Sequence, residues 1–203
     1  TPLIEDEVGQ AVEKFETQGV KSICICFLHS YANPSNERQA VKIAQDALEA
    51  VIPKIKIGMT EKELSSELVM QLLKHGSVSE MPFAPIVSAG PNSANPHASP
   101  TKRKIQTGDL LVVDWGAAHD GYISDLTRTF AVGEVDEEYK KIHKIVQESN
   151  AAGRAAAKPG VPCAAVDIAA REVIEKSGYG KYFTHRTGHG IGLEGHEWTN
   201  FVL

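Results

Sequence analysis

The chain has 203 residues, of which 42% are hydrophobic and 23% charged, as in an ordinary globular domain. Its net charge of −5 at pH 7 predicts no nucleic-acid partner, because no basic field would attract phosphates. No apolar run approaches the roughly 18 residues that span a bilayer, so neither a membrane segment nor a signal peptide is predicted. The cysteines have no redox or zinc-binding spacing, and reduced thiols favour a cytoplasmic location.

The first half of the chain is predicted to alternate helices with single strands. Hydrophobic periodicity predicts a helix over residues 2–18, and the apolar run Val20–Leu28 predicts a buried strand. A second helix is expected over residues 37–51, with one apolar stripe formed by Ala40, Ile43, Ala44, Ala47 and Leu48. The stretch "TEKE", which begins at Thr60, is a capping box that opens a third helix. "FAPIVSAG" is typical of a strand, and "PNSANPHASPT" is typical of a loop.

The second half carries a hairpin, two helices and a glycine-rich end. "LLVVDWGAAHDGYISDLTRTF" predicts the hairpin, and residues 136–157 predict a long helix. Another helix is expected over residues 164–176, with its buried side formed by Ala165, Ile168, Ala169 and Ile174. "YFTHRTGHGIGLEGHE" is expected to form a strand and turn. Helices mixed with hairpins predict an α+β fold, an antiparallel sheet with helices packed on one face.

Two aspartates of the hairpin are predicted to share a face. Asp120-Gly121 has the sequence of a two-residue turn, which would place Asp114 opposite Thr127. Asp125 is two residues from Thr127, and residues two apart on a strand point the same way. The two carboxylates would then be diagonal neighbours, about 7–8 Å apart at the backbone, and could converge on one small volume.

Converging carboxylates repel each other unless one is protonated or a cation lies between them. Carboxylate and imidazole ligands suit Mn²⁺, Co²⁺ or Zn²⁺. The alternative is a pair of acids on the solvent face of a hairpin, with no ligand. Three histidines, His185, His189 and His196, cluster among glycines that let the backbone approach a ligand, and His97 lies in the loop "NPHA". One histidine with two aspartates would make a partial metal site, and the others could transfer protons or polarise a carbonyl.

Four stretches together resemble the pita-bread metallopeptidases, the group of Xaa-Pro dipeptidases, aminopeptidase P and methionine aminopeptidases. They are "GMTEKEL", "PNSANPHASPT", "GDLLVVDWGAAHDGYISDLTRTF" and "HRTGHGIGLEGHE", in the family's order and spacing over about residues 39–203. "NPHA" and "GHGIGLEGHE" are more similar to the Xaa-Pro branch than to the methionine branch. The resemblance implies a partial pita-bread fold and metal-dependent hydrolysis of Xaa-Pro peptide bonds.

The same resemblance implies a role for individual residues. Asp114 matches a ligand of one metal ion, Asp125 matches the ligand that bridges two ions, and His189 matches a histidine ligand. His97 and His196 match histidines that contact the substrate and stabilise the tetrahedral intermediate, so they are the expected catalytic residues. The implied cofactors are divalent metal ions, Mn, Co or Zn, two in the family. The implied substrate is a proline-containing dipeptide or peptide.

Two departures from the family pattern bear on function. The family supplies two further glutamate ligands after "EGHE", but "WTNFVL" holds no acid, so the site is expected to be incomplete and its activity impaired. In place of the family's N-terminal domain, "GVKSICICFLHSYANPSNERQA" resembles a segment of the hydantoinase A / 5-oxoprolinase family. We therefore expect a chimera of two parts, a helix–strand segment over residues 1–38 and a truncated catalytic domain over residues 39–203.

Three functional interpretations follow from these patterns. The leading one is an Xaa-Pro metallopeptidase with impaired activity. The alternative is a catalytically inactive chimera or fragment with weak metal binding. A third, part of an ATP-dependent amidohydrolase, depends on the N-terminal stretch alone. Chains are also expected to form homo-oligomers through an exposed sheet edge, since an unpaired strand invites pairing.

Overall fold

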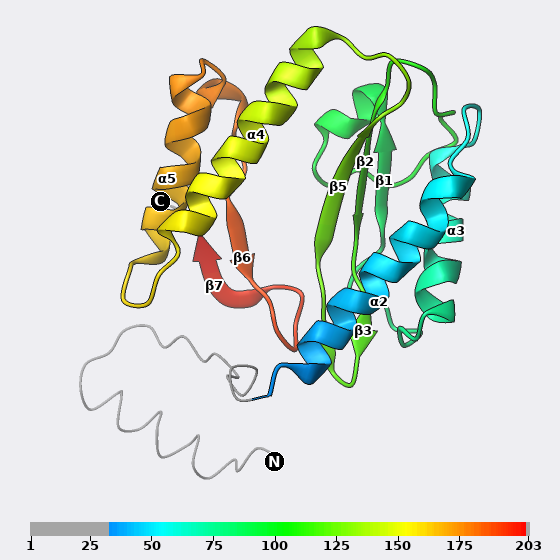
Figure 1. Cartoon of the computed structure of the whole chain (residues 1–203), viewed down its shortest axis with the longest axis horizontal. Coiled ribbons are helices and arrows are strands. Elements are labelled where there is room, and N and C mark those ends of the chain that lie inside the picture. Colours follow the sequence, from blue (N-terminus) through cyan, green and yellow to red (C-terminus); the bar gives the residue numbers. More distant parts are fainter. Residues whose placement is uncertain (1–32, 202–203) are drawn as a thin grey trace.

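The computed structural model describes residues 33–201, so the helix and strand predicted within residues 2–28 lie outside the described part. Its α-helices are α2 (Ser35–Val51), α3 (Glu61–Lys74), α4 (Glu137–Ala156) and α5 (Cys163–Lys176). Its strands are β1 (Ile86–Ala89), β2 (Leu110–Trp115), β3 (Ala118–His119), β4 (Tyr122–Ile123), β5 (Leu126–Ala131), β6 (Gly188–Gly190) and β7 (Glu197–Phe201). Short 3₁₀ helices are η1 (Ile52–Lys54), η2 (Gly90–Ala94) and η3 (Gly180–Tyr182). In the view of Figure 1, a three-stranded sheet lies between the pair α2–α3 and the pair α4–α5.

Helices α2 and α3 form where the hydrophobic spacing predicted them. The capping box is confirmed, because Thr60 Oγ1 accepts the N–H of Glu63 at 3.2 Å and Glu63 Oε2 accepts the N–H of Thr60 at 2.7 Å. Every residue of the stripe predicted on α2 is buried. This stripe packs with α3 and the sheet into one core, which includes Leu64, Leu68, Leu72, Leu111, Val113 and Trp115.

The central sheet has the strand order β1–β2–β5, and both strand pairs are antiparallel. Side chains of β2 alternate strictly, so its odd-numbered residues are buried in the core and its even-numbered residues, Asp114 among them, point to the opposite face. The predicted α+β fold is confirmed, with α2 and α3 packed on one face of the antiparallel sheet. Within residues 33–201, no helix is both long enough and apolar enough to cross a membrane.

The predicted register of the hairpin is also confirmed. Asp120 has φ 49° and Gly121 has φ 81°, and positive values at both positions define the tight turn that suits a twisted hairpin. Beyond the turn, His119 pairs with Tyr122 and Asp114 pairs with Thr127.

The middle of the hairpin is fixed to α2. A side chain at Gly116 would meet the carbonyl oxygen of Ser124 at 2.0 Å, so the two strands approach each other where only glycine fits. The hydroxyl of Ser124 accepts the N–H of Ala117 at 3.0 Å and donates to the carbonyl of Ala40 in α2 at 3.1 Å. The segment between Asp114 and Asp125 is therefore fixed both by the close approach of its two strands and by a hydrogen bond to α2.

Helices α4 and α5 pack closely on each other. A Cβ added at Gly153 of α4 would lie 3.4 Å from the Cβ of Ala170 in α5, and the Ser149 hydroxyl donates to the carbonyl of Ala170 at 2.8 Å. Beyond α5, β6 and β7 form an antiparallel hairpin in the predicted strand–turn region.

The predicted buried side of α5 is wrong in part. Ile174 is buried as expected, but Ile168 is 42% exposed, and Ala165 and Ala169 are half-buried. The side chain that takes the buried position is Asp167, which is fully buried. The physical reason is an ion pair, because the carboxylate of Asp167 accepts hydrogen bonds from Arg171 and is thereby stabilised inside the protein.

Candidate functional site

The hairpin brings two carboxylates together on the sheet face opposite α2 and α3. Burial, followed by the nearby negative charge of Asp125, raises the pKa of Asp114 to about 6, although a hydrogen bond with Thr127 acts in the other direction. The Oδ1 atom of Asp114 is buried and has no hydrogen-bond partner among residues 33–201. A buried acceptor without a partner, beside a second carboxylate, is an arrangement that a cation would stabilise.

His189 of β6 lies beside this pair. Its Nε2 atom is 3.4 Å from Oδ2 of Asp125, and its Nδ1 atom is 2.9 Å from the carbonyl oxygen of Gly190. A carbonyl can only accept a hydrogen bond, so Nδ1 carries a proton, and a neutral ring keeps its lone pair on Nε2. His189 is therefore set up to present a ligand atom next to Asp125.

The histidine rings of this region lie in two pairs. The ring centroid of His196 is 4.2 Å from that of His189, and the centroid of His97 is 5.3 Å from that of His185. Partial burial, together with His189 and Arg186, lowers the pKa of His196 and favours its neutral form. A neutral imidazole can both donate and accept a hydrogen bond, which suits it to contact a peptide group.

The loop that carries His97 is held by a buried carboxylate of α3. Glu61 is fully buried and accepts hydrogen bonds from the N–H of Ala89 at 2.8 Å, from Asn92 Nδ2 at 3.0 Å, and from the N–H and hydroxyl of Thr101 at 2.9 and 2.6 Å. Desolvation opposes ionisation, but these hydrogen bonds, led by that of the Thr101 hydroxyl, lower the pKa of Glu61. The ionised carboxylate thus ties both ends of the loop to α3.

The predicted residues come together only in part. Asp125 adjoins both Asp114 and His189, and His196 stacks beside His189. Among residues 33–201, however, no three ligating side chains meet closely enough to enclose a metal ion. Glu197 does not join the pair, because its Oε1 atom accepts the N–H groups of Leu193 and Glu194 at 3.0 and 3.1 Å and closes the turn before β7.

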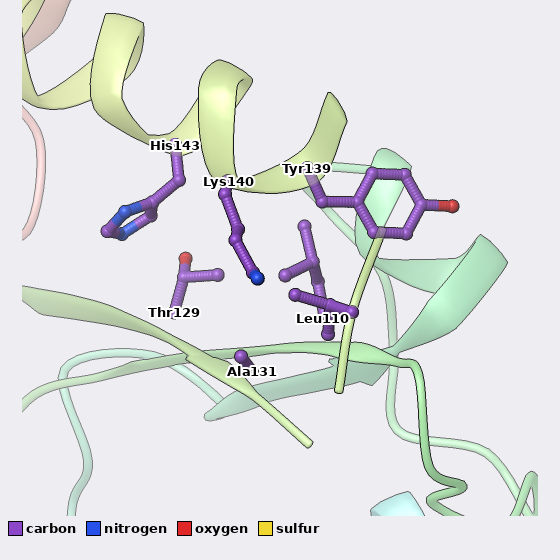
Figure 2. Close-up of a pocket in the computed structure, with 7 residues that line it drawn as sticks. Leu110, Thr129, Ala131, Tyr139, Lys140 and His143 are labelled. Carbon is purple, nitrogen blue, oxygen red and sulfur yellow. The ribbon is translucent and has the colours of Figure 1, made fainter. Parts of the chain in front are cut away.

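A separate hollow lies between the sheet and α4. It has a volume of about 170 Å³ and is lined by Leu110, Thr129, Ala131, Val135, Tyr139, Lys140 and His143. Figure 2 shows Lys140 of α4 pointing toward the strands, with Tyr139 and His143 on either side of it. None of the aspartates and histidines predicted to act in the site lines this hollow, so it is distinct from the candidate site.

Two carboxylates, Glu61 and Asp167, hold the segments that carry the histidines, and the sequence does not predict this role for either. The pattern around Glu61 predicts only a capping box, whereas its side chain contacts a loop about 30 residues further along the chain. Asp167 is not among the residues predicted for the buried side of its helix, although it is fully buried. Asp167 and Arg171 are four residues apart, which is a readable signal for an ion pair, but this spacing does not reveal that the pair is buried.

Comparison with known proteins gives two family matches. Residues 35–203 match the model of metallopeptidase family M24, and residues 1–48 match that of the hydantoinase/oxoprolinase N-terminal region. The chain is 40% identical over 163 residues to an Xaa-Pro dipeptidase from Lactobacillus helveticus, an alignment that covers 80% of the chain and 42% of that protein. It is 41% identical over 160 residues to an Xaa-Pro dipeptidase from Pyrococcus furiosus, covering 79% of the chain and 46% of that protein.

Solved structures agree with the sequence matches. An X-Pro aminopeptidase from Thermotoga maritima superposes with a TM-score of 0.83 at 34% identity, covering 98% of this chain and 52% of that one. A prolidase from Pyrococcus furiosus superposes with a TM-score of 0.80 at 37% identity, covering 84% and 50%. The chain spans about half the length of these relatives. The resemblance and the partial pita-bread fold expected from the sequence are confirmed.

Proposed function

The chain belongs to metallopeptidase family M24, and on that premise we propose that it acts in metal-dependent hydrolysis of Xaa-Pro peptide bonds. The observation that carries the proposal is the position of Asp125 between Asp114 and His189. The similarity to Xaa-Pro dipeptidases supports a proline-containing dipeptide or peptide as substrate.

We propose Asp114, Asp125 and His189 as ligands of divalent metal, with Mn²⁺, Co²⁺ and Zn²⁺ as the candidates. The fit of these residues to a cation rests on the buried, unpartnered Oδ1 of Asp114 and on the lone pair of His189 Nε2 beside Asp125. Divalent ions held there would lower the pKa of water and stabilise the negative charge that develops on a peptide carbonyl.

We propose His97 and His196 as the catalytic residues that contact the substrate. Both are exposed at the site, so a peptide can reach them. The lowered pKa of His196 keeps its ring neutral at pH 7, and a neutral ring can donate a hydrogen bond to an oxygen that gains negative charge.

A polypeptide of these 203 residues is proposed to bind metal weakly and to hydrolyse Xaa-Pro dipeptides slowly. The reason is the ligand set, because the family resemblance implies two glutamates that "WTNFVL" does not contain. Three ligands leave the second of two ions poorly held. The alternative remains an inactive chimeric or fragment domain with weak metal binding.

The organisation and setting of the chain are also proposals. We propose a junction between two parts near residue 38, which is supported by the overlap of the two family matches over residues 35–48. The free thiol of Cys163 supports a cytoplasmic location.

In the described part, β1 and β5 are the edge strands of the central sheet, which supports self-association through one of them. Sedimentation across a wide range of protein concentrations tests the last point, and a monomer throughout would overturn it.

The activity proposal is tested by measuring proline release from Xaa-Pro dipeptides with Mn²⁺ or Co²⁺ added. The expected turnover is far below the order of 10 s⁻¹ that is typical of enzymes, and Asp125→Asn abolishes it. Asp120→Asn is the matched control, because Asp120 is an exposed acid of the same hairpin that lies in the turn. Equal rates in wild type and Asp125→Asn would refute the ligand assignment, and the absence of both release and metal binding would establish the inactive alternative.

A further inference from the structure

Arg171, Asp167 and Thr187 form a clamp between α5 and the segment that carries His185. We propose that these three are positioning residues, which hold residues 183–187 against α5 and thereby set the place of His189. This inference deepens the proposed function and rests on it, because His189 is there assigned as a metal ligand. The clamp residues themselves would touch neither metal nor substrate.

The guanidinium group of Arg171 makes the first half of the clamp. Its Nε and Nη2 atoms donate to the two carboxylate oxygens of Asp167 at 2.9 and 3.1 Å. Its Nη1 atom donates to the carbonyl of Phe183 at 2.8 Å, and Nη2 also donates to the carbonyl of His185 at 3.2 Å. The same group lies 4.5 Å from the centroid of the Phe183 ring. The one planar guanidinium group therefore contacts residues 183–187 at two carbonyl oxygens and one aromatic ring.

The carboxylate of Asp167 makes the second half. Its Oδ1 atom accepts both the backbone N–H of Thr187 at 3.1 Å and the Thr187 hydroxyl at 2.6 Å. Asp167 is fully buried, and burying a charge is unfavourable unless hydrogen bonds compensate for it. A hydrophobic side chain at this position would serve simple helix packing, whereas a carboxylate fixes the direction in which Thr187 approaches.

His189 needs such an anchor because its own strand is short. Strand β6 has three residues, two of them glycines, and its pairing with β7 shifts register between His189 and Gly190. Glycine backbones are free to rotate, so a ladder this short cannot fix the histidine by itself. Thr187 is two residues before His189, and its two hydrogen bonds to Asp167 attach this part of the chain to α5.

The first test compares Arg171→Lys with the matched control Arg103→Lys. Arg103 also donates to both oxygens of an aspartate, Asp109, at 2.7 and 2.8 Å, and to the carbonyl of Lys104 at 3.1 Å, but none of these hydrogen bonds reaches residues 183–187. Lysine cannot reproduce the fork of either arginine, so both variants should lose thermal stability. Calorimetric titration with Co²⁺ alone should show roughly 10-fold to 100-fold weaker binding for Arg171→Lys only, the usual effect of losing a group that orients a ligand. Equal Co²⁺ affinity in Arg171→Lys and wild type would overturn the proposal, and so would an equal loss in both variants.

The second test uses the hydroxyl of Thr187 and needs no metal. Thr187→Val removes the hydroxyl at nearly constant volume, and Thr187→Ser keeps it. In the metal-free protein, the ¹H–¹⁵N signals of the His189 ring should shift and broaden in Thr187→Val and return to their wild-type positions in Thr187→Ser. Unchanged ring signals in Thr187→Val would overturn the positioning role. If wild type fails to bind Co²⁺, the metal assignment falls, while these ring signals still decide whether the clamp places His189.

Discussion

Asp114, proposed above as a metal ligand, lies in an environment that is unfavourable for the stability of the metal-free fold. Its side chain is half-buried beside Asp125, and its Oδ1 atom is buried without a hydrogen-bond partner in the described part of the chain. Ionisation of Asp114 is therefore less favourable in the folded state than in water. Strain of this kind is common at functional sites, because a ligand supplies the missing interaction when it binds.

Asp114→Asn should stabilise the metal-free protein near neutral pH. The pKa of Asp114 is about 6 in the folded state and 3.8 in a model peptide, so the folded state holds its proton more tightly. The free energy of unfolding therefore falls as pH rises from 3.8 to about 6. Removing the charge should recover about 1–3 kcal/mol at about pH 7.5 and almost nothing at about pH 4. Urea denaturation with a chelator at both pH values measures this, and an Asn variant that is less stable at the higher pH would contradict it.

Glu61→Ala, in contrast to Asp114→Asn, should destabilise the protein. Removing this carboxylate leaves the buried N–H of Ala89 and the partly buried donors of Asn92 and Thr101 without an acceptor, which should cost about 3 kcal/mol. Because the pKa of Glu61 is lowered in the folded state, its contribution to stability is present above 4.5, the ordinary value for glutamate, and is lost as pH falls below it. Acid-unfolding curves of this variant and of the exposed control Glu80→Ala measure the difference. Equal midpoints for the two variants would show that Glu61 does not anchor the loop.

At the scale of elements, the turn of the β3–β4 hairpin decides where Asp125 points. Gly121→Ala should destabilise the protein by about 1–2 kcal/mol, because φ at this position is 81° and a side chain there is strained. The loss would come from the backbone, since an added Cβ meets only Leu193, at 3.9 Å. Asp120→Asn is the control, as asparagine tolerates positive φ, and should change stability little. Urea denaturation compares the two, and a Gly121→Ala variant as stable as wild type would mean that the turn does not define the register.

The elements differ in how far the sequence could predict them. The hairpin register was predictable because Asp120-Gly121 fits one turn type and side chains alternate strictly along the strands. The buried face of α5 was not, because Asp167 is stabilised by Thr187, whose approach depends on tertiary structure. Hydrophobic periodicity assigns only apolar residues to the buried face, so it cannot predict a carboxylate that is buried because it is paired. The aspartate pair was likewise predictable from one hairpin, whereas the meeting of His189 with Asp125 requires the arrangement of distant elements.

At the scale of the whole molecule, two packing units share the candidate site. The α2–α3 unit contains the main core, built from α2, α3, β1 and β2. The α4–α5 unit has its own small buried group, Ile145, Ala170 and Ile174, which is not part of that core. Asp114 and Asp125 belong to the first unit, and His189 follows the second in the chain (Figure 1).

The α4–α5 unit should open before the α2–α3 unit does. Local opening is easiest where few apolar groups are buried, and the main core lies in the α2–α3 unit. Hydrogen exchange at increasing urea should therefore release the amides of α4 and α5 together, ahead of those of α2 and α3. A single free energy of exchange for all four helices would show that the molecule unfolds as one cooperative body.

Because His189 lies against Asp125 where these units meet, the proposed metal binding would depend on how the two units pack together. A ligand that touches both units sees only the docked fraction of molecules, so its apparent affinity is its intrinsic affinity multiplied by that fraction. A substitution between α4 and α5, such as one that crowds Gly153 against Ala170, would thus weaken binding without touching any ligand-contacting atom. Conversely, an ion bound by both units would raise the fraction of molecules in which the units are packed together. Part of any activation by metal would then come from this shift in population.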